Sequence, residues 1–232
     1  MLNKSIRKSG LLVLFLFMLS LIGSAHQDNK GNPIPHFLFP KFKDGIIIMK
    51  DGAKFNAVLN YNMVDERMIT EVDGIYRYSK NPQKIERIMI DNRTFIPFGS
   101  AFYEILTSGN VTIFLQNKSS LTPKGSDTGY GYKSKSVGPV ASTRFELTPV
   151  THQYQEVAYI DLPQNVEVTP ASIYWVSMGD KLKSFSTEKQ FTKLFPEYST
   201  QLKDYIRNED IKIKNREDLI KLGVYCNEIM KK

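Results

Sequence analysis

The sequence predicts an α+β protein that is predominantly β. An antiparallel meander is expected to form a curved sheet, a sandwich or a half-barrel, followed by a small helical module. Three observations lead to this prediction. Short β-branched and aromatic runs recur from residue 46 onward, Asp-Gly pairs separate neighbouring runs, and helical spacing of apolar residues is confined to residues 181–232. The 232 residues are 41% hydrophobic and 12% aromatic, which is enough to build a core. The chain has one cysteine, so no intramolecular disulfide can form and the core must supply the stability.

Residues 1–25 have the layout of a secretory signal peptide. Basic residues within 4–8 precede an apolar run over 11–22, and small residues lead up to Ala25. The run is shorter than the roughly 20 residues that span a bilayer. We therefore expect cleavage after Ala25 rather than an uncleaved anchor. The mature chain is then secreted or periplasmic, with no integral membrane segment.

Residues 26–45 are polar and rich in proline, and they predict an extended lead-in whose aromatic residues cover a sheet edge. Residues 46–180 form the predicted β domain. Two pairs, Asp51-Gly52 and Asp73-Gly74, each separate two strand-like runs, so each predicts a two-residue hairpin turn. Further strands are expected at 85–90, 94–98, 101–106, 111–116, 143–147, 156–162, 166–168 and 173–178.

Two residues carry specific expectations within this β domain. Pro97 lacks a backbone N–H, so it predicts that the strand at 94–98 lies at an edge or end of the sheet. Trp175, the single tryptophan, is expected in the core.

Residues 117–140 interrupt the strand pattern and predict a flexible loop. One interpretation is a solvated loop; the other is a binding loop that presents Tyr130, Tyr132 and Lys133 to a glycan or a protein. These three residues are the candidate binding site. The loop lacks the pattern of a phosphate-binding loop, because Tyr132 takes the place of the lysine and no helix is expected to follow.

Residues 181–232 have helical character. Thr187 with Gln190 predicts a capping box, Pro196 suits the first turn of a second helix, and Asn215 is expected to cap a third. The buried stripe of that last helix is predicted to be Leu219, Leu222, Cys226 and Ile229. A module of about fifty residues has little room for a hydrophobic core of its own, so we expect it to pack against the β domain.

The formal charge of +7 is unevenly distributed. Residues 1–25 carry +3, residues 26–180 are neutral, and residues 181–232 carry +4 with interspersed acidic residues. A nucleic-acid-binding protein concentrates its basic residues on one face of the mature domain, so this distribution argues against a nucleic-acid partner. A membrane-surface role for the basic tail stays open as an alternative.

No motif predicts catalysis, a metal or a cofactor. The three histidines, at 26, 36 and 152, form no His-x-x-x-His pair, and the sequence has no Gly-x-Ser-x-Gly elbow. Cys226 lies on an apolar stripe, which predicts a buried, inert thiol. The strand aromatics fit a core better than a ligand groove; they are Tyr61, Tyr76, Tyr78, Phe95, Phe98, Phe102 and Tyr103.

Several segments carry a resemblance. They are Met49-Lys50-Asp51-Gly52, Leu59-Asn60-Tyr61-Asn62 and Glu66-Arg67-Met68-Ile69, with Phe191-Thr192-Lys193-Leu194-Phe195-Pro196, Ile211-Lys212-Ile213-Lys214 and Asp218-Leu219-Ile220 in the tail. Together they resemble uncharacterised exported proteins of Bacteroidetes-type bacteria, which have a β-rich body and a helical end. The resemblance carries no catalytic motif, and it implies an envelope or secreted protein.

The sequence therefore predicts an exported, non-enzymatic structural or interaction module of the bacterial envelope, with a protein or glycan as its partner. The alternative is a carbohydrate-active or other hydrolytic enzyme whose site is assembled from sequence-distant residues. A deep pocket with converging acidic, histidine or arginine side chains favours the enzyme, and a filled sheet interior favours the module.

Overall fold

The computed structural model describes residues 34–79, 81–124, 126–128, 132–134, 162, 166–179 and 181–231. The strands are β1 (Lys43–Met49), β2 (Lys54–Asn62), β3 (Arg67–Val72), β4 (Ile75–Tyr78), β5 (Ile85–Ile90), β6 (Arg93–Phe98), β7 (Ala101–Thr107), β8 (Thr112–Gln116), β9 (Ser119–Pro123), β10 (Ser126–Thr128), β11 (Tyr132–Ser134), β12 (Val166–Pro170), β13 (Ile173–Met178) and β14 (Lys181–Phe185). The predicted signal peptide, the expected strand at 143–147 and, apart from residue 162, the expected strand at 156–162 lie outside the described residues.

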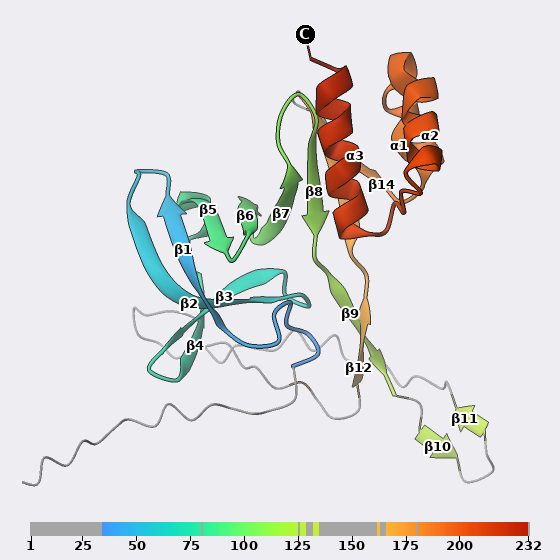
Figure 1. Cartoon of the computed structure of the whole chain (residues 1–232). Helices are drawn as coiled ribbons and strands as arrows, with labels where there is room; N and C mark the ends of the chain where they lie inside the picture. Colours follow the sequence, from blue (N-terminus) through green and yellow to red (C-terminus); the bar gives the residue numbers. More distant parts are fainter. Residues whose placement is uncertain are drawn as a thin grey trace, which may run out of the picture. The chain divides into compact units, whose positions relative to one another are not determined.

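The fold is mostly β, as predicted, and its main element is one open sheet of ten antiparallel strands (Figure 1). The strand order is β14-β13-β8-β7-β6-β5-β1-β2-β3-β4. Two further sheets, β10-β11 and β12-β9, have two strands each. We call the face of the large sheet that carries Phe95 and Leu115 its inner face, and the opposite face its outer face.

One of the two predicted Asp-Gly hairpins has the expected turn. Asp73 and Gly74 alone connect β3 to β4, and both have positive φ, at 53° and 73°, as a type I′ turn requires. The expected two-residue turn is wrong at Asp51-Gly52, where residues 50–53 connect β1 to β2. There the Asp51 carboxylate accepts a hydrogen bond from the backbone N–H of Ala53 at 3.0 Å, which stabilises a longer turn.

The sheet curls around a buried cluster on its inner face, which we call the β core. Its buried members are Phe39, Leu59, Tyr61, Met68, Ile85, Ile88, Ile90, Phe95 and Phe102. Because the sheet curls, the turn that precedes β3 lies against β7. There the Glu66 carbonyl accepts a hydrogen bond from the Phe102 N–H at 3.1 Å, and the Tyr61 hydroxyl donates to the Phe102 carbonyl at 3.0 Å. Aromatic side chains fill the interior of this curved sheet.

Pro97 does not place its strand at an edge, because β6 lies between β5 and β7. The prediction is wrong for a local reason. β5 pairs with β6 only as far as Phe95, and the N–H of Phe102, opposite Pro97, is bonded to Glu66 instead. The nitrogen of Pro97, which carries no hydrogen, therefore points to the β5 side of β6, beyond the last residue with which β5 pairs.

The lead-in before β1 is tied to the sheet by its backbone and its aromatic side chains. The Asn60 side chain accepts from the Phe39 N–H at 3.2 Å and donates to the Phe39 carbonyl at 2.9 Å. Phe39 then enters the β core, while Phe37 packs with Ile69 and Tyr78 on the outer face of β3 and β4.

The expected loop over 117–140 contains β9, β10 and β11. β9 pairs with β12, so that Leu121 lies opposite Val168. A local pattern could not reveal this pairing, because β9 is short and its partner strand lies far along the chain.

The tail is helical, as predicted. It contains α1 (Glu188–Lys193), α2 (Ser199–Asn208) and α3 (Arg216–Ile229), with a short 3₁₀ turn at Pro196–Tyr198. Thr187 caps α1 by accepting from the Gln190 N–H at 3.2 Å, and Asn215 caps α3 by accepting from the Asp218 N–H at 3.1 Å. No helix in the described ranges is long and apolar enough to cross a membrane.

The helices pack on the inner face of β7, β8, β13 and β14 and form a second buried cluster, the helix core (Figure 1). Leu219, Leu222 and Cys226 of α3 are fully buried there with Ile113 and Val176. Asn227 fixes the register of α3 on the sheet, because its side chain accepts from the Val111 N–H at 2.9 Å and donates to the Val111 carbonyl at 2.8 Å.

Replacing Asn215 with alanine is expected to lower the free energy of unfolding by about 1 kcal/mol, because the first turn of α3 loses its cap. Urea unfolding followed by circular dichroism measures the change. Asn208→Ala is the matched control, since Asn208 is exposed at the last residue of α2, and it is expected to be neutral. Equal effects of the two substitutions would contradict the capping role.

Candidate functional site

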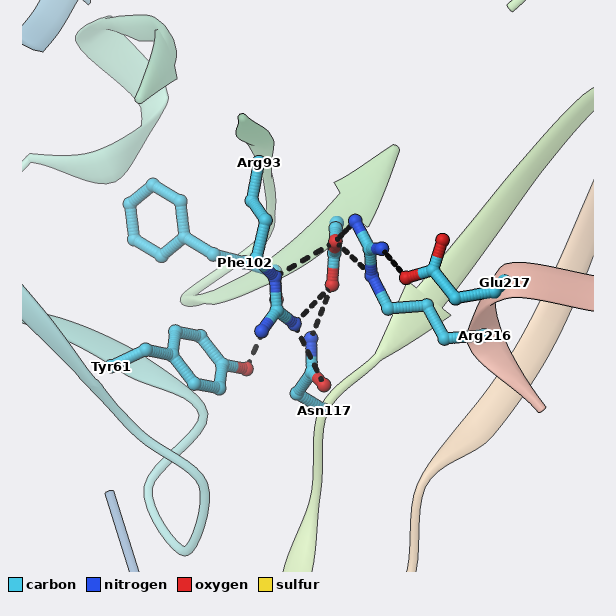
Figure 2. Close-up of polar contacts among 7 residues, drawn as sticks. Tyr61, Arg93, Phe102, Asn117, Arg216 and Glu217 are labelled. Carbon is cyan, nitrogen blue, oxygen red and sulfur yellow. Dashed lines mark hydrogen bonds and ion pairs between the residues drawn. The ribbon is translucent and has the colours of Figure 1, made fainter. Parts of the chain in front are cut away.

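A buried carboxylate lies where the β core and the helix core meet. Glu104 follows Phe102 on the inner face of β7, and its side chain is 0% exposed. An ionised carboxylate in such a position is stable only with charged or hydrogen-bonded partners. Figure 2 shows the side chains that surround it.

Two arginines and an amide saturate Glu104. Arg93 on β6 donates from Nε to Oε1 at 2.9 Å and from Nη2 to Oε2. Arg216, the first residue of α3, donates to Oε1 from Nε at 2.8 Å and lies 2.6 Å from it through Nη2. Asn117 donates from Nδ2 to Oε2 at 3.2 Å. We call these four residues the Glu104 cluster.

The arginines are held in place on their other sides. The Arg93 guanidinium lies over the rings of Phe39 and Phe95, at 5.2 and 5.5 Å from their centroids. Burial lowers the pKa of Arg216, but its hydrogen bonds to Glu104 and the charge of that carboxylate outweigh burial and raise the pKa overall. Arg216 therefore stays charged, and both oxygens of Glu104 stay occupied.

This geometry makes the Glu104 cluster a structural clamp. A general acid or base needs an oxygen that can reach a substrate proton, whereas each oxygen of Glu104 accepts at least two hydrogen bonds within the protein. The clamp joins β6 and β7 to the start of α3, and so connects the β core to the helix core. Sequence reasoning missed it, although Glu104 alternates with the apolar residues Phe102 and Leu106.

A second group of side chains lies on the outer face. Tyr103 stacks on Phe98, with 4.5 Å between ring centroids, and lies nearly parallel to Trp175 at 6.1 Å. The expected core position of Trp175 is wrong, because β13 directs Tyr174 inward and Trp175 outward, where it is half-buried. The indole N–H of Trp175 donates to Gln116 Oε1 at 2.9 Å.

A chain of polar contacts continues from this tryptophan. Gln116 donates from its amide to the Glu66 carboxylate, which also pairs with Lys118 at 2.7 Å. Glu66 has a φ of 57°, a conformation uncommon for a residue with a side chain, in the turn that connects β2 to β3. The chain fixes the orientation of Trp175 on the outer face and joins that turn to β8.

The residues singled out from the sequence fall into different places. Tyr132 and Lys133 lie on β11, opposite Thr128 and Asp127 of β10, and Tyr130 lies outside the described residues. Most of the strand aromatics belong to buried clusters, as expected; those that are buried are Tyr61, Tyr78, Phe95 and Phe102. Phe98 and Tyr103 are instead half-buried on the outer face.

The described residues contain no group of three or more His, Cys, Asp or Glu side chains placed to hold a metal ion. His36 is buried, and His26 and His152 lie outside the described residues. Cys226 is a free, buried cysteine, as predicted.

Stability is expected to fall as the pH rises above about 9. Burial raises the pKa of Cys226 from 9.0 to about 12, and burial is also the largest cause that raises the pKa of Tyr61 and Tyr78 above 10.0. The unfolded chain loses these protons first. Cys226 therefore lowers the free energy of unfolding by up to about 1.4 kcal/mol per pH unit from about pH 9 to about pH 12, and each of the two tyrosines does so from about pH 10 upward. Urea titrations across this range measure the slope.

The control for this pH dependence is Cys226→Ala, which removes one titrating group. Its free energy of unfolding is expected to decline less steeply between about pH 9 and pH 10 than that of the wild type. Identical slopes would contradict the assignment to Cys226.

Comparisons of the chain with protein-family models, with curated proteins and with solved structures found no match.

Proposed function

We propose that this chain is an exported, non-enzymatic interaction module of the bacterial envelope, and that its partner surface is the outer face of the large sheet. The leader-like residues 1–25 support export. The Glu104 cluster supports a non-enzymatic role. The enzyme alternative requires charged side chains that converge on a substrate, whereas the charged side chains of this cluster pair with one another.

The observation that carries the proposal is that the sheet is apolar on both faces. Four strands read as continuous apolar runs, Ile46–Ile48, Ile88–Ile90, Ile113–Leu115 and Tyr174–Val176. Such runs are typical of strands that are buried on both faces, whereas a strand with one solvated face alternates apolar and polar residues. The inner-face residues of these runs are covered by the β core and the helix core.

Among the described residues, the outer face has no such cover over β1, β5, β6, β7, β8 and β13, whereas Phe37 packs on it at β3 and β4. From β1 to β13 its apolar side chains pack against none of the buried clusters. Ile48 and Phe114 are buried; those that are half-buried or exposed are Ile46, Met89, Ile96, Phe98, Tyr103, Ile105, Ile173 and Trp175. Ile46 and Met89 are paired across β1 and β5 and are 39% and 38% exposed. The other six side chains are half-buried. Apolar surface that stays partly exposed on one face of a sheet marks interaction sites. Half of it is aliphatic, which favours a protein partner over a glycan.

Photo-crosslinking in cells tests the proposed function. A photoreactive phenylalanine analogue replaces Met89 on the outer face or, as the matched control, Val224 on α3, which is 48% exposed. We expect an adduct from position 89 and none from position 224, with the processed chain recovered outside the cytoplasm. Absence of an adduct at position 89, or recovery of the chain from the cytoplasm, would overturn the proposal.

A further inference from the structure

We infer that the start of the helical tail docks on an anionic lipid surface through four lysines. The inference goes beyond the proposed function, because it assigns a second surface, on the inner side of the sheet, to a different kind of partner. Three features carry it: the lysines lie on adjoining elements, they have no acidic partners, and no exposed aromatic ring lies among them.

The four lysines come from the last strand and the first helix. Lys181 and Lys183 lie on β14, and Lys189 and Lys193 lie on α1, which follows β14 after residues 186 and 187. All four are exposed. Residues 181–193 contain one acidic residue, Glu188, so this segment carries a net charge of +3. We call the four lysines the lysine patch.

The sheet register places the two strand lysines on the side that the helices cover. Lys183 lies opposite Val176 of β13, so it shares the inner face with a member of the helix core. Phe185 lies on the same face and contacts Phe191 of α1, with 4.9 Å between their ring centroids. Lys183 and Lys181 are therefore about 7 and 13 Å along the strand from the point where α1 packs.

The two helix lysines lie on the solvent side of α1. They are four residues apart, which places them on one face of the helix, about 6 Å from each other along its axis. Phe191 and Thr192 are the buried residues of α1, so Lys189 and Lys193 project away from the helix core. The lysine patch thus combines the free side of α1 with the strand beside it.

The lysine patch lacks acidic partners. Among the described residues, none of its four amino groups forms an ion pair, whereas four basic side chains further along the tail do; these pairs are Arg207–Asp204, Lys212–Asp210, Arg216–Glu104 and Lys221–Asp218. β14 is an edge strand, and an edge strand uses lysine to block pairing with other strands. That role does not account for the two lysines of the helix. Unpaired charge of one sign on adjoining elements attracts a surface of the opposite sign.

The chemistry of the lysine patch favours a lipid surface over an anionic glycan. The described phenylalanines within and beside it, Phe185, Phe191 and Phe195, are buried in the helix core, so none offers a ring on which a sugar could stack. Lysine is a compact charge that, unlike arginine, does not bind an anionic group in a fixed geometry. Clusters of about four to eight basic residues recognise anionic lipids, and each residue strengthens the binding about fivefold.

Cosedimentation with vesicles tests the docking. The protein, purified as its cells produce it, is expected to bind phosphatidylglycerol vesicles at about 0.01 M salt, where charges interact over about 30 Å. It should be released at about 1 M salt, where this distance falls to about 3 Å. Phosphatidylcholine vesicles, which have no net charge, should not retain it. No retention on phosphatidylglycerol at low salt, or equal retention on both lipids, would overturn the inference.

Paired substitutions locate the contact. Lys189→Gln with Lys193→Gln is expected to weaken binding to phosphatidylglycerol vesicles about 25-fold, at about fivefold for each lysine. Lys50→Gln with Lys54→Gln is the matched control, because both lysines are exposed on the β domain and the two double variants have the same net charge. The control should change binding less than about twofold. Unchanged melting temperatures confirm that both variants fold. Equal losses would show that binding follows net charge alone, which contradicts the lysine patch.

A soluble polyanion separates a lipid surface from a glycan. Polygalacturonate carries carboxylates but forms no bilayer, and at equal charge concentration we expect it to bind more weakly than the vesicles do. Tighter binding to polygalacturonate would identify a glycan partner and overturn docking on lipid. Neither result affects the crosslink from position 89, so the lysine patch and the proposed outer-face partner fail or stand separately.

Discussion

Replacing Glu104 with alanine is expected to lower the free energy of unfolding by about 3–5 kcal/mol. The substitution leaves Arg93 and Arg216, whose side chains are 16% and 24% exposed, facing each other without the carboxylate that compensates both. Asn117 loses an acceptor in the same place. Urea unfolding at neutral pH measures the change, and the loss should appear as a lower midpoint with an unchanged slope.

Two further variants show whether the charge or the packed volume causes this loss. Glu86→Ala is the surface control, because Glu86 pairs with Arg87 while both side chains are 44% exposed, and its effect should be under about 0.5 kcal/mol. A triple variant with Arg93→Met, Glu104→Leu and Arg216→Met should be more stable than Glu104→Ala alone, since it leaves no unpaired charge. A cost below about 1 kcal/mol for Glu104→Ala would contradict the clamp.

Replacing Gly223 with alanine is expected to destabilise the protein by about 2 kcal/mol, although alanine is the better helix former by about 1 kcal/mol. A Cβ at this position of α3 would meet Oγ1 of Thr107, and would lie 2.7 Å from its Cγ2 and 3.0 Å from its Cβ. α3 must therefore move away from β7. Thermal and urea unfolding both measure the loss.

The double variant Gly223→Ala with Thr107→Ala is the matched test of this contact. Removing the Thr107 side-chain tip makes room for the new methyl group, so the double variant should recover most of the lost stability. If the two effects simply add, steric overlap between α3 and β7 is not the cause.

Sequence reasoning predicted the elements whose signals are local. The turn at Asp73-Gly74, the cap at Asn215 and the apolar stripe of α3 depend on residues within a few positions of one another, and the structure confirms each. β9 escaped prediction because its partner strand is distant. Pro97 misled because its position in the sheet depends on where β5 stops pairing with β6.

The candidate sites depend on strand order, which no local pattern contains. The Glu104 cluster needs β6 beside β7 and the start of α3 across the inner face. Two signals were nevertheless present in the sequence: a glutamate within the inward stripe of β7, and the unbroken run Ile46–Ile48. The first indicates a buried charge that needs partners, and the second indicates a strand covered on both faces.

The Glu104 cluster also bears on when the chain can fold during its synthesis. Glu104 and Arg93 are made early, but Arg216 and the strands β13 and β14 that extend the sheet come last. Contacts between such distant segments form slowly, because a long loop must close before they contribute to stability. Until α3 has been made, Glu104 lacks its second arginine and the helix core lacks the three buried residues of α3, Leu219, Leu222 and Cys226. The chain therefore reaches its native state only after its last helix has been translated.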